Sequence, residues 1–243
     1  MLHAMDRVDL VGHSAANTKA RSGMYRVLSV LFRQELSAGQ IDQMRGPEFR
    51  DALSKAGVML PDDFFIQTGP QHLADLEVEY ARLFVGPGRH ISPHESVHRK
   101  DEQSGLYGHA TVSVKQFIET AGFRFQSDYK GLPDHISVEL EFMQTLTRWE
   151  AEAWELDDTD LAMKCIELES RFVQEHLIYW IPPFCAKVVK EAELPFYREI
   201  AKLTSEFIVM EKKHLTAAKH TIPTEGIDHQ SSCIDKQSEH ISE

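Results

Sequence analysis

An acid and an imidazole stand side by side in Pro133-Asp134-His135, at the start of a strongly apolar segment. Asp134 offers an anionic acceptor and His135 titrates near neutral pH, so the pair could hold a cationic ligand or control a hinge. Aspartate at a helix start also satisfies free amide groups in proteins that have no ligand there. Because no Ser or Cys stands in the sequence setting of an activated nucleophile, the pair fits binding better than hydrolysis.

Histidine and glutamate residues could also bind a metal. Three histidines are spaced by four: His90, His94 and His98. Two Glu-x-x-His motifs are present, Glu95 to His98 and Glu211 to His214, and carboxylate-bridged di-iron bundles use two such motifs with two further glutamates. The first motif lies in a Pro-rich loop or single turn, and lysines flank the second, which favours a solvated helix surface. A di-iron helical-bundle enzyme is therefore the weaker alternative from another class.

Tyr80, Leu83 and Phe84 place an aromatic ring and two bulky apolar groups on one face of a helix. Such a face could line a groove that grips the apolar part of a peptide. The same spacing more often marks a stripe that faces the core. The pattern alone leaves both interpretations open.

Apolar residues at helical spacing predict a succession of helices. We expect them over residues 20–36, 47–56, a turn near 61–65, 71–84, a short helix capped by Ser92 in the loop 85–108, 111–121, 133–156, 159–181, 184 onward and 195–216. Pro133 is placed as a first helical residue, and Pro182-Pro183 as a helix end. No run alternates like a strand between hairpin signals, so the fold class is all-α.

The helices are expected to form one bundle-like fold of two lobes. Residues 20–122 and 133–216 make up the lobes, and a connector around residues 123–132 joins them. The polar composition of residues 1–19 and 217–243 predicts disordered ends.

The charge balance is acidic, with 26 basic and 38 acidic side chains and a formal net charge of -12. This argues against nucleic acid or anionic membranes as partners and favours a cationic peptide. Three cysteines, Cys165, Cys185 and Cys233, show no paired motif, which fits a reducing cytoplasm. Without an apolar leader or membrane span in the sequence, we expect a soluble, cytoplasmic, unexported protein.

Five segments, taken in order, resemble the TorD/DmsD family of chaperones for molybdoenzymes. They are Glu79-Tyr80-Ala81-Arg82-Leu83-Phe84 with Gly86-Pro87, Ser92-Pro93-His94-Glu95-Ser96-Val97, Leu106-Tyr107-Gly108, Pro133-Asp134-His135-Ile136 with Glu139-Leu140-Glu141-Phe142-Met143, and His176-Leu177-x-x-Trp180-x-Pro182-x-Phe184. The resemblance covers about residues 20 to 215.

This resemblance implies an all-helical protein, not an enzyme, that binds the twin-arginine signal peptide and the apo catalytic subunit of a molybdopterin enzyme until the cofactor is inserted. The family's peptide-binding motifs map onto Tyr80, Leu83 and Phe84 and onto Pro133, Asp134 and His135. Gly131-Leu132-Pro133 stands where the family often has Glu-Pro-x, so that glutamate's role is not carried over.

Further expectations follow from the resemblance. Asp134, Glu77 and Glu79 are expected to face the two arginines, and Tyr80, Leu83 and Phe84 the apolar segment. The family includes monomers and lobe-exchanged dimers, and members that bind guanine nucleotide weakly, although no nucleotide motif is visible and no cofactor is expected. An assembly scaffold that binds no signal peptide is the third possibility.

Overall fold

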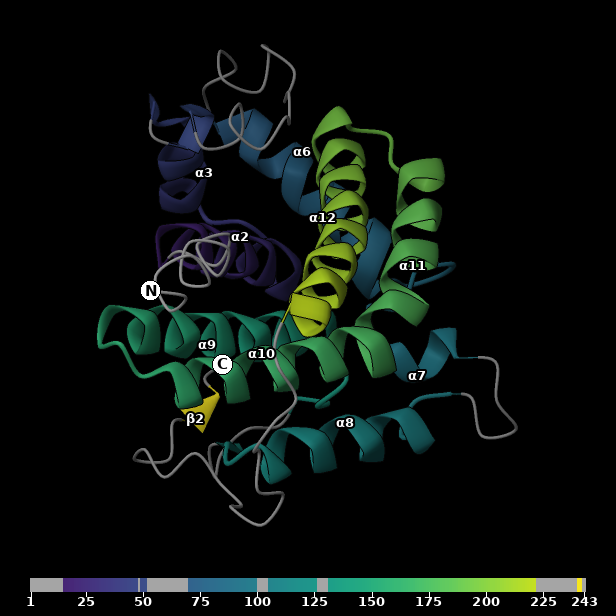
Figure 1. Cartoon of the computed structure of the whole chain (residues 1–243). Helices are drawn as coiled ribbons and strands as arrows, with labels where there is room; N and C mark the ends of the chain where they lie inside the picture. Colours follow the sequence, from purple (N-terminus) through teal and green to yellow (C-terminus); the bar gives the residue numbers. More distant parts are fainter. Residues whose placement is uncertain are drawn as a thin grey trace, which may run out of the picture.

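The apolar stripes of the sequence form packed helices in the computed structural model, which describes residues 15–47, 49–51, 70–99, 105–125, 131–221 and 240–241. The all-α prediction is confirmed (Figure 1). The α-helices are α2 (Ala15–Arg33), α3 (Ala38–Arg45), α6 (Pro70–Tyr80), α7 (Glu95–His98), α8 (His109–Thr120), α9 (Ile136–Glu155), α10 (Thr159–Phe172), α11 (Ile178–Glu191) and α12 (Pro195–Thr221). Two π-helical turns, η2 (Ala81–Val85) and η3 (Val173–Leu177), extend α6 and α10.

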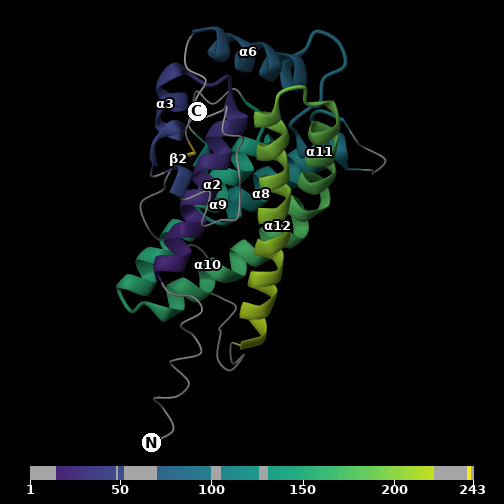
Figure 2. The same ribbon diagram turned by 90° about the horizontal axis from the view of Figure 1, so that it is seen from above.

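Helices from both sides of the predicted connector share one hydrophobic core. α2 lies along α9, α10 lies beside α9, and α11 packs against α12 (Figures 1 and 2). The largest fully buried side chains include Tyr25 of α2, Trp149 of α9 and Trp180 of α11. The first predicted lobe therefore contributes its first long helix to the core of the second. Residues 126–130 of the connector lie outside the described residues.

A buried charged cluster joins four helices. The guanidinium of Arg21 in α2 donates to Glu150 of α9 at 2.8 Å, to Glu169 of α10, and to Glu211 of α12 at 2.9–3.0 Å. Tyr25 donates its hydroxyl to Glu211 at 3.0 Å. Burial raises the pKa of Glu169 well above its ordinary value, although Arg21 opposes the shift.

The prediction that Glu211 lies on a solvated surface is therefore wrong. Its side chain is only 1 % exposed. The neighbouring lysines suggested a polar helix end, but Lys212 and Lys213 are exposed while Glu211 faces the core. An inward glutamate is tolerated because a guanidinium from a distant helix neutralises it.

The predicted helix end at Pro182-Pro183 is also wrong, because both prolines lie inside α11. They fall within the first six residues of α11, directly after the π-helical turn η3, and prolines and π-helical turns are common places for a helix to bend rather than end. The chain bends here instead, and α10 and α11 run in different directions in Figure 1.

Other predicted boundaries shift by a few residues. α2 begins at Ala15, inside the segment predicted to be disordered, and α12 continues to Thr221, past the predicted start of the tail. β1 (Arg124–Phe125) and β2 (His240–Ile241) pair in parallel. Two residues of the segment predicted to be a disordered tail thus pair with the first part of the predicted connector. Residues 47 and 49–51 are helical, while the rest of the helix predicted over 47–56 and the turn near 61–65 lie outside the described residues.

In the part of the chain that the structure describes, no helix combines the length and the apolar character that crossing a membrane requires.

Candidate functional site

The segments around Glu95 and Asp134 are held side by side by backbone hydrogen bonds. The Glu95 N–H donates to the Asp134 carbonyl at 2.9 Å, and the Ile136 N–H donates to the Pro93 carbonyl at 2.9 Å. His94 and His135 form an antiparallel bridge between these bonds, and their rings meet edge to face at 4.9 Å. The bridged residues are 41 residues apart in the sequence, so two distant motifs form one structure, to which α7 belongs.

Asp134 is fully buried and caps α7. Its Oδ2 accepts the N–H of Ser96 at 2.9 Å, which satisfies one of the free amide groups at the start of that helix. The expectation that this aspartate serves a helix start is met, but the helix is α7 and not α9. Ser92 does not cap α7 as predicted, because the N-cap is His94, which makes no side-chain capping bond.

His135 is the N-cap of α9, and its Nδ1 accepts the N–H of Ser137 at 3.2 Å. Pro133 lies in the turn before the helix, not at its first position as predicted. Burial, together with the smaller effects of the nearby His94 and Arg33, lowers the pKa of His135 to about 3. A neutral imidazole is required here because the capping nitrogen must keep its lone pair.

Two buried glutamates and their partners complete this region. The Glu95 carboxylate contacts Nδ1 of His176 at 2.9 Å and Arg99 at 2.6 Å. Glu139 accepts the indole N–H of Trp180 at 2.9 Å. Burial raises the pKa of Glu139 well above its ordinary value, and the neighbouring Glu95 raises it further. We call Glu95, Asp134, Glu139, His176 and Trp180 the motif junction.

Glu95 and Glu139 lie in the sequence motifs, but the sequence does not predict that these two acids are buried. Glu95 and Glu139 are 0 % exposed, whereas a capping box and an amphipathic helix both predict glutamates that face water. The sequence holds one indication of their burial, because His176 and Trp180, which can each donate a hydrogen bond to a carboxylate, occur in another motif of the same chain. Each buried acid needs a donor, and these two side chains supply one each.

The predicted metal ligands do not gather into a metal site. Within the described ranges no group of three or more His, Cys, Asp or Glu side chains could hold an ion. His98 stacks on Trp180 at 5.6 Å and bonds the Ser92 carbonyl at 2.7 Å, and burial lowers its pKa. Glu211 is committed to Arg21. The di-iron alternative thus finds no ligand set in the described residues.

Tyr80, Leu83 and Phe84 lie in the core, with side chains 4, 2 and 5 % exposed. Tyr80 donates its hydroxyl to the Phe32 carbonyl at 3.0 Å. Phe84 meets Phe184 at 6.0 Å, and Phe184 in turn meets Trp180 of the motif junction at 5.6 Å. The face therefore supports the motif junction through one shared ring, and it does not line an open groove in this structure.

Glu79 is buried and already bonded. Its Oε1 accepts the N–H of Glu193 at 2.7 Å and of Leu194 at 3.2 Å, and its carboxylate also accepts two bonds from Arg82. The carboxylate thus fixes the turn between α11 and α12. Glu77, two residues earlier, is half-buried.

Exposed apolar side chains lie on the outer side of the motif junction. The large ones are Val97, Leu106, Tyr107 and Tyr179, which are 40–77 % exposed. The Gly105 N–H donates to the Ser96 carbonyl at 2.9 Å, which sets Leu106 and Tyr107 beside α7, and Arg99 lies over the Tyr179 ring at 4.9 Å. Tyr107 has a φ of 66°, which is unusual for a bulky residue. We call these four residues the outer patch.

Comparison with known proteins identifies similar chains. The family model described as nitrate reductase delta subunit matches residues 45–186. Proteins named chaperone protein TorD are similar over most of their length. The one from Shewanella loihica is 26 % identical, covering 82 % of this chain and 94 % of its own. Those from Psychrobacter sp. and Vibrio cholerae are 24 % and 23 % identical, covering 71 % and 79 % of this chain and 80 % and 90 % of theirs.

Proposed function

The chain belongs to the nitrate reductase delta subunit family, whose TorD members are molybdoenzyme maturation chaperones and not enzymes, and we propose that it binds the twin-arginine signal peptide of one molybdoenzyme. In this proposal, the chain also holds the catalytic subunit of that enzyme in the cytoplasm until the molybdenum cofactor is inserted. The proposed role requires no cofactor bound to the chain itself.

The observation that carries the proposal is the convergence of three of the five motif segments on the motif junction, beneath the outer patch. Motifs that lie as far apart as Glu95 and His176 meet there through side-chain bonds between fully buried groups. Buried acids cost stability unless they are bonded, so such an arrangement serves to fix α7 and the loop after it. An exposed apolar patch rimmed by polar residues is typical of a protein-binding surface.

We assign the predicted peptide-binding residues to two roles. Pro133, Asp134 and His135 position α7 and α9, and Tyr80, Leu83 and Phe84 support them from within the core. The outer patch contacts the apolar segment of the signal peptide, and the acidic surface attracts its two arginines. This division accounts for the burial of Asp134, which bonds an amide of α7 and has no exposed surface to offer an arginine.

Titration calorimetry with a twin-arginine signal peptide from a molybdoenzyme catalytic subunit tests the proposal. Asp134→Ala removes the cap of α7 and is expected to bind about tenfold more weakly. Asp134→Asn keeps an oxygen that accepts from Ser96 and is expected to retain most of the affinity. Tyr107→Ser changes only an exposed side chain and is expected to weaken binding without changing stability.

Leu83→Ala should cost about 2–5 kcal/mol of stability because it opens a cavity, so its folding is checked by circular dichroism before titration. Unchanged affinity in both Asp134→Ala and Leu83→Ala would remove these residues from the binding region. If the unaltered chain binds no twin-arginine peptide, the signal-peptide function is wrong and an assembly scaffold becomes the better account.

A further inference from the structure

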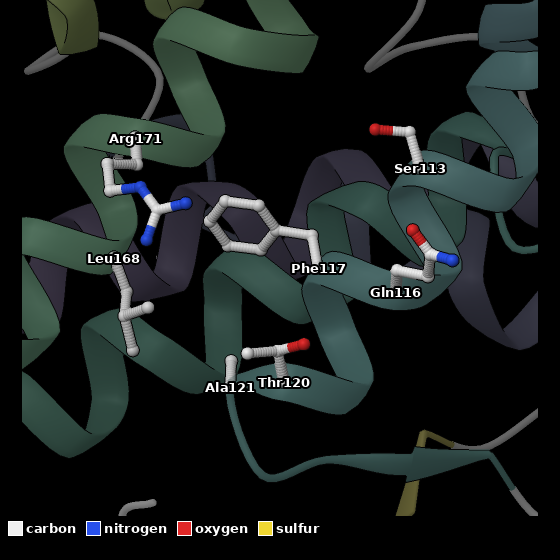
Figure 3. Close-up of a pocket in the computed structure, with 7 residues that line it drawn as sticks. All are labelled: Ser113, Gln116, Phe117, Thr120, Ala121, Leu168 and Arg171. Atoms are coloured by element: carbon white, nitrogen blue, oxygen red, sulfur yellow. The ribbon is translucent and has the colours of Figure 1, made fainter. Parts of the chain in front are cut away.

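A cavity of about 220 Å³ lies between α8 and α10, on a face that the proposed function does not use. Figure 3 shows Phe117 reaching from α8 toward Arg171 of α10. Ser113, Gln116 and Thr120 follow one stripe of α8 at its edge, and Leu168 completes the α10 side. An apolar floor thus meets a polar rim.

The rim offers hydrogen-bond donors that the described part of the protein leaves unused. Nε of Arg171 donates to Glu175 at 3.2 Å, but its two terminal nitrogens have no hydrogen-bonding partner among the described residues. The side chains of Ser113, Gln116 and Thr120 also make no hydrogen bond within that part of the chain. A guanidinium with two free terminal nitrogens is suited to bind a carboxylate through paired bonds.

The floor is held rigid. The guanidinium of Arg171 lies over the Phe117 ring at 5.1 Å, and Phe172 packs edge to face against the same ring at 5.1 Å. Phe117 also meets His176 of the motif junction at 5.8 Å. A group that enters the cavity therefore rests on a ring that also contacts the buried His176.

The size of the cavity limits its occupant. Sites for cofactors and drug-sized molecules usually enclose about 300–1,000 Å³, so this cavity suits a group no larger than one amino-acid residue. Free donors and an apolar floor together select a residue with both a carboxylate and an aliphatic or aromatic body. Polypeptides present such groups at a C-terminus or as an acidic side chain.

We propose that this cavity binds a carboxylate of a polypeptide partner, at a C-terminus or on an acidic side chain, with Arg171 and the α8 rim on the carboxylate and Phe117 and Leu168 under the carbon body that carries it. The inference deepens the proposed function and rests on it for the partner. A twin-arginine peptide is cationic and does not supply this group, so another part of the client subunit does.

Nuclear magnetic resonance titration with small probes tests the cavity without knowledge of the client. N-acetyl-leucine carries an apolar body and a carboxylate, and N-acetyl-leucinamide is its uncharged match. The acid is expected to shift the backbone signals of Phe117, Thr120, Leu168 and Arg171 saturably, with a dissociation constant on the order of millimolar. The amide should bind at least about tenfold more weakly, because it loses the paired bonds to Arg171.

Variants locate the binding. Arg171→Gln removes the guanidinium and Thr120→Trp fills the cavity, and both are expected to abolish the shifts. Lys115→Gln, on the exposed side of α8 where Lys115 pairs with Glu119, is expected to leave them unchanged. N-acetylglutamic acid α-amide, whose only carboxylate is on the side chain, separates an acidic side chain from a C-terminus as the source.

Equal binding of N-acetyl-leucine and its amide, or shifts that survive Arg171→Gln, would overturn the proposal. So would the absence of saturable shifts with both carboxylates. A parallel titration of the same sample with the twin-arginine peptide keeps the two proposals apart. Peptide binding without probe binding defeats the cavity alone, whereas probe binding without peptide binding defeats the signal-peptide function alone.

Discussion

At the scale of the single residue, His135 links the stability of the motif junction to pH. It caps α9 through Nδ1 and meets the His94 ring edge to face. Burial is the main reason why its pKa falls to about 3, well below the ordinary value of 6.5. The folded protein thus keeps this imidazole neutral at pH values where the unfolded chain binds a proton.

Stability should fall as the pH drops from about 6.5 toward 3 because of this residue. In that window the unfolded state holds a proton on His135 that the folded state lacks, so acid favours unfolding. At pH 4 the contribution is at most about 3 kcal/mol, since one pKa unit corresponds to about 1.4 kcal/mol. The measurement is the free energy of unfolding in urea at pH 7 and pH 4.

The comparison with His135→Asn isolates the effect. Asparagine caps helices well and does not titrate, so the variant should lose less stability between pH 7 and pH 4 than the unaltered chain. The raised pKa values of Glu139 and Glu169 act in the opposite direction in both proteins and cancel in the difference. Identical losses in the two proteins would show that His135 is not kept neutral by folding.

Asp134 shows what residue types alone can predict. Its role in capping a helix follows from the chemistry of a carboxylate next to free amide groups, and the structure has that chemistry. Which helix it caps does not follow, because the partner amide at Ser96 is 38 residues away in the sequence. Local patterns specify the kind of bond, while only the packing of helices specifies the partner.

At the scale of the elements, the cluster around Arg21 fixes how α2, α9, α10 and α12 meet. One guanidinium serves three buried glutamates, each on a different helix. Arg21→Met should destabilise the fold by about 3–5 kcal/mol, because it leaves those carboxylates without a cation. The loss should be smaller at pH 5 than at pH 8, since acid neutralises the stranded glutamates. Urea denaturation at both pH values measures it.

Lys19→Met is the matched control in the same helix. Lys19 pairs with Glu155, but both side chains are about half exposed. Surface pairs contribute about 0–1 kcal/mol, so this variant should be close to the unaltered chain at either pH. A similar loss of unfolding free energy in both variants would mean that removing a cation at any position of α2 destabilises the fold, and that the buried cluster has no special role.

The sequence predicts the helices well and their ends less well. Apolar spacing finds α2, α8, α9, α10 and α12 because each buries one stripe against the core. Pro182 misleads, because a π-helical turn lets the chain bend and resume a helix around it. Helical spacing favours a core-facing Tyr80, as observed, but the partner of its hydroxyl is beyond local pattern, since it is the Phe32 carbonyl of another helix.

At the scale of the whole molecule, the net charge of -12 is the property that bears on the approach of a client. The acids of the motif junction are buried and bonded, so in the proposed function the attraction for two arginines arises from the summed surface charge and not from one contact. Such a field raises the association rate and weakens with salt, because the screening length falls from about 30 Å at 0.01 M to about 3 Å at 1 M.

The association rate of a twin-arginine signal peptide should therefore fall by about tenfold between 0.02 and 0.5 M salt, while its dissociation rate changes little, because apolar contacts set how long the complex lasts. Stopped-flow fluorescence with a labelled peptide measures both rates. A peptide with glutamine in place of both arginines should associate more slowly at low salt and show little salt dependence. If salt instead acts on the dissociation rate of the arginine peptide alone, the arginines are held by a direct ion pair. If salt acts equally on both peptides, the arginines are not recognised. Either result would contradict steering by the acidic surface.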